Sequence, residues 1–269
     1  MSDHANMDNF IRTAYRDQIL EIILNRPEKR NAINWSMMLS LEKAVEHAER
    51  EADARVVLLR GEGLGFSSGV DYFSMSDLAE IFGENWRDNM MSVTASYQQI
   101  LNRFERCRLP TIALLHGFSF GLGFELAIAC DFRIATEDTK LRLPEVQLGL
   151  VPDVGGTTRL TNLVGPARAK EIIITGRVLD SNQAYNWGLL NAVVPQDELY
   201  NQGKELAQEI INSAPLAVSY TKRIINDMSD IDRGLQLEAL AQNHLIQSED
   251  FMTGLQALLS KTNPKWRGK

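Results

Sequence analysis

The sequence predicts an α/β protein whose C-terminal part is helical, and three observations support this fold class. Segments rich in β-forming residues alternate with amphipathic helical segments from residue 18 to about residue 195. No strand-like run follows Val194. Hydrophobic side chains make up 44% of the 269 residues, which is enough for one large core. We therefore expect an α/β body over residues 1–195 and a helical region over residues 196–269.

The first predicted elements are a strand, a helix and a second strand. Residues 18–25 form a β-rich run that ends before Pro27, which cannot donate a ladder hydrogen bond. Apolar residues recur with helical spacing over residues 36–52, and charged residues occupy the other face. Residues 55–60 predict another strand, and residues 61–69 form a loop punctuated by glycines.

The same alternation continues along the chain. A helix is predicted over residues 92–106, a strand over 111–115, a turn over 117–123 and the opening of a helix over 124–129. Short strands are predicted at 132–135 and 141–143. Further helices are predicted at residues 157–163, 167–174, 181–187 and 199–213, with strong apolar helical signals at 235–246 and 255–259.

Charge and composition exclude several classes of partner. A formal net charge of -7 argues against a nucleic-acid or anionic-membrane binder, because such partners need a clustered basic surface. The two cysteines lack metal-ligand spacing and indicate a reducing compartment. The polar, acidic start does not match a signal peptide, and the apolar region 111–130 contains His116, Glu125 and glycines. We expect a cytoplasmic protein with no membrane partner and no metal site.

Two glycine motifs lie between the strand and the helix near residue 120. The dinucleotide fingerprint fails, because its third glycine would fall on Leu126. The run Gly117-Phe-Ser119-Phe-Gly121 matches the Gly-x-Ser-x-Gly elbow of serine hydrolases, which makes Ser119 an alternative nucleophile. His244 is the only downstream base for it, and it lies in a helix-like stretch. A small residue in a tight turn is the favoured interpretation of Ser119.

Two glutamates are candidates for acid/base chemistry. A glycine-rich turn that opens a helix presents free N–H groups, which can stabilise a developing oxyanion. If the helix begins near Leu122, Glu125 lies three residues on and on nearly the same face. It could be an ordinary first-turn acid, but its apolar neighbours predict a buried and therefore costly carboxylate. Glu145 follows Pro144 in an apolar setting that could raise its pKa.

Several spaced motifs together resemble the crotonase, or enoyl-CoA hydratase/isomerase, superfamily from about residue 18 to the C-terminus. They are Asn25-Arg-Pro-Glu-Lys-Arg-Asn-Ala32, Phe66-Ser-Ser-Gly-Val-Asp71, residues 117–131, Pro144-Glu145 with Gly149 and Pro152, Gly155-Gly-Thr157 and residues 172–177. The resemblance implies a crotonase-like ββα spiral with two roughly perpendicular sheets. It also implies a C-terminal helical region used for trimerisation, in a homotrimer or a dimer of trimers.

The resemblance also implies roles for individual residues. The N–H groups of Val70 and Leu122 would form an oxyanion hole for the thioester carbonyl. Glu125 and Glu145 would add water across a 2-enoyl-CoA, with coenzyme A present only as part of the substrate and with no other cofactor. Coenzyme A would be bound by Lys29, Arg30, Ala32, Ser68, Gly69, Asp71, Tyr72 and Gly121. A solvated turn remains the alternative for the two basic residues of this set.

Asp153 departs from the hydratase pattern, in which a glycine usually stands beside the catalytic water. An acid at this place resembles the dienoyl-CoA isomerases and the carnitinyl-CoA dehydratase group. Asp153 is therefore either a third proton-transfer group or the N-cap of a helix that starts near Val154. Double-bond isomerisation and carnitinyl-CoA dehydration therefore remain alternatives to hydration. The acyl chain is not predicted, although four residues are candidates for its pocket or for helix packing: Phe82, Trp86, Met90 and Met91.

Overall fold

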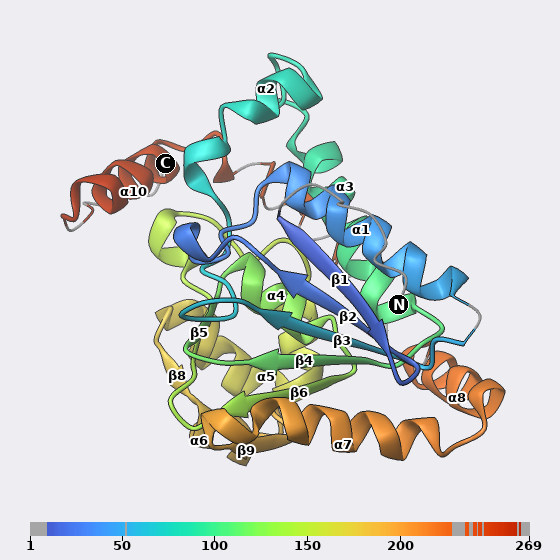
Figure 1. The fold of residues 1–269 in the computed structure, drawn as a ribbon. Helices are drawn as coiled ribbons and strands as arrows, with labels where there is room; N and C mark the ends of the chain where they lie inside the picture. Colours follow the sequence, from blue (N-terminus) through green and yellow to red (C-terminus); the bar gives the residue numbers. More distant parts are fainter. Residues whose placement is uncertain are drawn as a thin grey trace.

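The computed structural model describes residues 10–51, 53–227, 235–236, 239–240, 242–243, 245–262 and 264. Its main sheet has six strands in the order β1-β2-β3-β4-β6-β9 (Figure 1). Their bounds are Ile11–Arg16 (β1), Ile19–Leu24 (β2), Val56–Gly61 (β3), Thr111–Leu115 (β4), Phe132–Thr136 (β6) and Ala192–Val194 (β9). The pair β1 and β2 is antiparallel, and the other neighbours are parallel.

A second sheet of three strands adjoins the main one. It consists of β5 (Phe118–Phe120), β7 (Lys140–Arg142) and β8 (Leu179–Asp180), in that order. An isolated bridge between Ser67 and Ser119 joins its first strand to the loop after β3. A turn was predicted over residues 117–123. The prediction is wrong for residues 118–120, which form strand β5 by pairing with β7.

The helical elements agree with most of the predicted ones. They are η1 (Pro27–Lys29), α1 (Trp35–Arg50), η2 (Tyr72–Ser74), α2 (Asp77–Phe82), α3 (Met90–Arg106), α4 (Leu122–Ile128), η3 (Glu145–Leu148), α5 (Gly156–Thr175), α6 (Ser181–Asn186), η4 (Gln196–Glu198), α7 (Leu199–Ile211), α8 (Pro215–Asp227) and α10 (Glu249–Ser260). Helix α5 is kinked at Gly165, which explains the two separate helices predicted there. The predicted helix at 235–246 lies partly outside the described residues. Within the described part of the chain, no helix is long and apolar enough to cross a membrane.

Both faces of the main sheet are covered by helices. Along β3 and β4, Val57, Leu59, Ala113 and Leu115 join one buried cluster together with side chains of α1, α3 and α4. The alternate residues join a second cluster with Leu199 and Ala207 of α7, and Figure 1 shows α7 along that face. The boundary near residue 195 thus marks the end of the strands, whereas α7 still packs on the α/β body.

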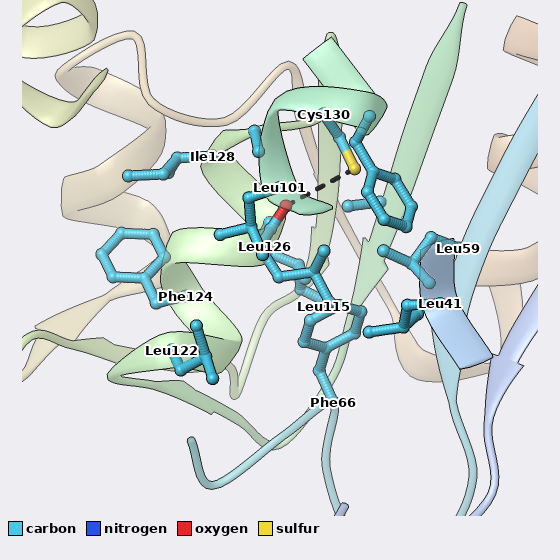
Figure 2. Packing of buried hydrophobic residues seen from close by; sticks show 14 of the residues in the cluster. Leu41, Leu59, Phe66, Leu101, Leu115, Leu122, Phe124, Leu126, Ile128 and Cys130 are labelled. Atoms are coloured by element: carbon cyan, nitrogen blue, oxygen red, sulfur yellow. Dashed lines mark hydrogen bonds between the residues drawn. The ribbon is translucent and has the colours of Figure 1, made fainter. Parts of the chain in front are cut away.

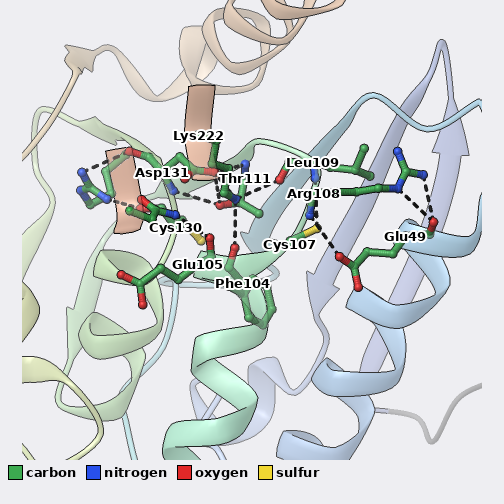
Figure 3. Close-up of polar contacts among 12 residues, drawn as sticks. Glu49, Phe104, Glu105, Cys107, Arg108, Leu109, Thr111, Cys130, Asp131 and Lys222 are labelled. Atoms are coloured by element: carbon green, nitrogen blue, oxygen red, sulfur yellow. Dashed lines mark hydrogen bonds and ion pairs between the residues drawn. The ribbon is translucent and has the colours of Figure 1, made fainter. Parts of the chain in front are cut away.

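Two side chains of helix α8, Lys222 and Asn226, bind the body, and Figure 3 shows the contacts of Lys222. The side chain of Lys222 is 8% exposed, and its Nζ donates to the carbonyl oxygens of Phe104 at 3.2 Å and Leu109 at 3.0 Å. The same Nζ pairs with Asp131 Oδ2 at 2.7 Å. Asp131 Oδ2 also accepts a hydrogen bond from the N–H of Thr111. Lys222 therefore links α8 to the C-terminal ends of α3 and α4.

The strand order places three loops side by side at the carboxyl ends of the strands of the main sheet. Strands β3, β4 and β6 are parallel neighbours, so their carboxyl ends lie side by side. The loop after β3 contains Val70, the segment after β4 leads to Leu122, and the segment after β6 leads to Glu145. In open α/β sheets ligands bind beyond the carboxyl ends of the strands. This edge is therefore the place to look for the site.

Candidate active site

The amides of Val70 and Leu122 lie on adjoining segments. Ile33 pairs with the two residues that flank Val70, because its N–H donates to Gly69 O at 2.7 Å and its carbonyl accepts from Asp71 N at 2.9 Å. The Val70 N–H therefore points away from Ile33. A Cβ on Gly69 would lie only 3.4 Å from the backbone nitrogen of Leu122. The structure thus brings together the two segments that were predicted to form an oxyanion hole.

Both amides are available to a ligand. Leu122 is the first residue of α4, and such a residue has no carbonyl one turn earlier to accept its N–H. Neither N–H donates a hydrogen bond to an acceptor among the residues that the structure describes. Val70 and Leu122 also line the same pocket. Two N–H groups that face one cavity can bind a carbonyl oxygen that acquires negative charge.

Glu125 is held deep inside the protein by the start of α5. All residues of α4 are buried, and Figure 2 shows Leu122, Phe124 and Leu126 within the apolar packing. Glu125 itself is only 2% exposed. Its Oε1 accepts hydrogen bonds from the N–H groups of Val154 at 3.0 Å and Gly156 at 2.8 Å. Such donors stabilise a negatively charged carboxylate and fix its orientation.

Glu145 carries a carboxyl group that is suited to proton transfer. It is the first residue of η3, it is 8% exposed, and its Oε2 has no hydrogen-bond partner among the described residues. Burial raises the pKa of Glu145 to about 8, and the nearby charge of Asp153 acts in the same direction. Gly121, with a φ of 49°, leaves room for this group, since a Cβ there would lie 2.8 Å from Glu145 Oε1. Glu145 can therefore hold a proton at neutral pH.

Asp153 lies in the same pocket and does not cap a helix. Helix α5 begins at Gly156, and Gly155, not Asp153, occupies the N-cap position. The predicted N-cap role of Asp153 is therefore wrong. Its Oδ2 instead accepts a hydrogen bond from Thr94 Oγ1 at 2.7 Å. Asp153 is buried and lines the pocket together with Glu125 and Glu145.

Only some of the residues that form the rest of the pocket were predicted from the sequence. The predicted residues Trp86 and Met90 line it, whereas Phe82 packs against Trp35 and Met91 is exposed. The remaining lining residues of α3, which were not predicted, are Val93, Thr94 and Tyr97. They follow Met90 at helical intervals of three, four and seven residues, so the periodicity of the helix would have revealed them.

The two segments proposed to bind coenzyme A lie next to each other. The N–H of Ser68 donates to Arg30 O at 3.0 Å, and Arg26 binds both Ala32 O and Asp71 Oδ2. Burial would raise the pKa of Asp71, but the ion pair with Arg26 at 2.6 Å outweighs it and lowers that pKa. The Asp71 carboxylate thus joins the two segments.

The other residues predicted to contact coenzyme A lie in two different places. Lys29 and Arg30 are exposed and form no ion pair within the described part of the chain. Tyr72 lines the pocket, and burial followed by the charges of Glu145 and Asp153 raises its pKa. The two basic side chains are therefore accessible to an anion, whereas Tyr72 forms part of the pocket wall.

The alternative hydrolase site is wrong. Ser119 lies within strand β5, not at a sharp turn after a strand, and it is completely buried. Its Oγ has no hydrogen-bond partner among the described residues, so none of the bases among them is positioned to activate it. The proposed base His244 lies outside the described residues.

The spiral of parallel strands and this pocket define the protein as a crotonase-fold enzyme. The chain belongs to the enoyl-CoA hydratase/isomerase family, whose model matches residues 15–269. It is 36% identical over 258 residues to the carnitinyl-CoA dehydratase of Salmonella enteritidis, which covers 93% of this chain and 95% of that protein.

Solved structures agree with this assignment. An enoyl-CoA hydratase from Bacillus anthracis is 34% identical and superposes with a TM-score of 0.74, over 97% of this chain and 100% of that one. An enoyl-CoA hydratase from Mycobacterium avium subsp. paratuberculosis is 25% identical, has a TM-score of 0.84, and covers 96% of this chain and 98% of its own. The fold class and the family predicted from the sequence are thereby confirmed.

Proposed function

We propose that the protein catalyses the reversible addition of water to a 2-enoyl-CoA. One observation carries the proposal: two free backbone N–H groups and two buried glutamates line a single pocket. The N–H groups of Val70 and Leu122 bind the thioester oxygen and stabilise the enolate that forms when water attacks. Relatives named enoyl-CoA hydratase support the substrate class.

The two glutamates take opposite roles in the proposed reaction. Glu125, whose Oε1 is held by two N–H donors, accepts a proton from water as its oxygen bonds to the β-carbon. Glu145, protonated at neutral pH, donates its proton to the α-carbon of the enolate. One hydroxide and one proton are added overall, and the proton left on Glu125 replaces the one lost from Glu145.

The exposed side chains of Lys29 and Arg30 would bind the phosphates of coenzyme A, and backbone groups of residues 68–72 and Gly121 would lie along the rest of it. The reaction needs no further cofactor, because coenzyme A is part of the substrate. Water addition transfers protons and no electrons, so the residues of the pocket supply all the groups required.

Asp153 favours a second candidate function. A third carboxyl group in the pocket, hydrogen-bonded to Thr94, could move a proton along the acyl chain and thus shift a double bond. Another candidate reaction is the elimination of water from a carnitinyl thioester, because one relative is named carnitinyl-CoA dehydratase. Each alternative uses the same oxyanion hole and differs in the protons moved.

The test follows the absorbance of crotonyl-CoA and of a 3,5-dienoyl-CoA in the ultraviolet. Glu125→Gln and Glu145→Gln are expected to lower hydration by about 10²–10⁴-fold, because each removes an acid/base group. Asp153→Asn leaves hydration within a few fold if water addition is the function, and Ser119→Ala serves as the control outside the pocket. Loss of dienoyl isomerisation in Asp153→Asn, with no hydration by the wild type, would replace the first function by the second.

We also propose a cytoplasmic homotrimer or dimer of trimers. Both cysteines are buried free thiols, which fits a reducing compartment. The outer side of α8 exposes four large apolar side chains, Leu216, Tyr220, Ile224 and Ile225, which fits a subunit interface. Sedimentation or light scattering tests the assembly, and a monomeric mass would contradict it.

A further inference from the structure

Gln242 lines the active-site pocket without taking part in the proposed chemistry. Its side chain is 5% exposed, and its Oε1 accepts no hydrogen bond from any described residue. The N–H of Ile246 donates to Gln242 O at 2.9 Å, so the two residues lie one helical turn apart on the same face. Ile246 lines the pocket as well. An unpaired carboxamide oxygen therefore belongs to a residue of the pocket wall.

The wall around Gln242 is largely apolar. Ile246 belongs to one buried cluster with Trp86, Met90 and Val93, and all four line the pocket. The chain segment before Gln242 is tied to the active site, because Gln98 Nε2 donates to Leu235 O at 2.9 Å and to Asp153 O at 2.6 Å. The apolar side chains beside Gln242 form the part of the pocket where an acyl chain would lie.

A hydrocarbon chain would gain nothing from this group. Oε1 is already buried without a partner, and a hydrocarbon chain would leave it so, at a cost of about 1–3 kcal/mol relative to a paired acceptor. A hydroxyl group on the chain would instead donate to Oε1 and supply the missing hydrogen bond. Sites built around a hydrogen bond to a substrate hydroxyl reject analogues that lack it.

The charges in the pocket narrow the class of substrate further. The lining includes the carboxyl groups of Glu125, Glu145 and Asp153, and no Lys, Arg or His is among the described residues that line it. A carboxylate on the acyl chain would be repelled by the charge of Asp153, one of these groups, in a poorly solvated cavity. A neutral hydroxyl carries no such penalty.

We propose that Gln242 is a specificity-determining residue that selects 2-enoyl-CoA substrates with a hydroxyl group on the acyl chain beyond the double bond. The inference rests on the proposed hydration reaction and adds the class of acyl group to it.

The experiment measures kcat/KM for hydration of chains of equal length. The substrates are 2-hexenoyl-CoA, its analogues hydroxylated on the fourth, fifth or sixth carbon, and the analogue with a terminal carboxylate. The wild type is expected to prefer one hydroxylated chain over the plain chain by about 10-fold or more. Gln242→Leu is expected to lower this ratio by about 10- to 100-fold, partly by raising the rate with the plain chain. Gln236→Leu removes an exposed glutamine of the same segment and leaves the ratio unchanged.

The outcomes separate this inference from the proposed function. Hydration of the plain chain with no preference for any hydroxylated one overturns the role of Gln242 and leaves the hydratase function intact. An unchanged ratio in Gln242→Leu, or a preference for the carboxylated chain, also overturns it. If Gln242→Leu does not fold, the ratio measured on the wild type still decides. Absence of hydration with every chain defeats the proposed function, and the inference with it.

Discussion

Replacement of Glu145 by glutamine removes a proton-binding site from the folded protein. Burial raises the pKa of Glu145 from 4.5 to about 8. Between these two values the folded protein keeps the proton, whereas the unfolded chain has lost it. The free energy of unfolding therefore decreases as the pH rises from 4.5 to 8, and it is insensitive to this group below 4.5. Glu145→Gln cannot titrate and should lose this part of the pH dependence.

The size of the effect follows from a single proton. One proton bound only in the folded state changes stability by about 1.4 kcal/mol per pH unit. From pH 6 to pH 8 the wild type should therefore lose about 2 kcal/mol more than Glu145→Gln. Urea unfolding at pH 6, 7 and 8 measures this difference. Glu84→Gln, which removes an exposed carboxylate of the same kind, should follow the wild type.

Two parallel stability curves for the wild type and Glu145→Gln would refute the reasoning. Such a result would mean that the folded protein does not hold a proton on Glu145 between pH 6 and 8. The role of Glu145 as the donor to the α-carbon would then lose its physical basis, even if the variant were inactive.

Three further predictions concern other parts of the structure. Gly121→Ala should lower hydration of crotonyl-CoA by about 10-fold or more, because the new Cβ would lie 2.8 Å from Glu145 Oε1; an unchanged rate would contradict this. Lys222→Met should destabilise the protein by about 3 kcal/mol in urea, since it leaves the partly buried carboxylate of Asp131 without its counter-ion, whereas exposed Lys43→Met should have little effect. Burial raises the pKa of both cysteine thiols to about 12, so iodoacetamide at pH 8 should label them only after unfolding.

The sequence alone identified the centre of the site because local residues determine its structure. A turn of small residues before an apolar helix predicted both the first residue of α4 and the burial of Glu125, and the structure has both. The apolar surroundings of Glu145 similarly predicted a raised pKa, which burial produces. Each of these features depends on a few consecutive residues, so it can be predicted from one segment of the sequence.

Features that depend on distant partners were missed. Strand β1 is an edge strand in which only Ile11 is buried, so it lacks the alternation of a half-buried strand. Its turn to β2 uses positive φ angles at Asp17 and Gln18; aspartate tolerates this conformation, but the second position of such a turn usually holds glycine. Gln242 reaches the pocket only through tertiary packing. No local pattern distinguishes it from the other glutamines of the C-terminal region.

Part of the crossover between β3 and β4 contributes to the wall of the pocket without contributing to the chemistry. Its stretch from Met75 to Met90 supplies Met75, Leu78, Trp86 and Met90 to the pocket but neither oxyanion donor and none of the carboxyl groups. The reacting groups belong to other segments, which the two sheets and α4 hold in place. Evolution, or a protein engineer, can therefore exchange or lengthen this one stretch to accept a different acyl group while the catalytic geometry is inherited unchanged.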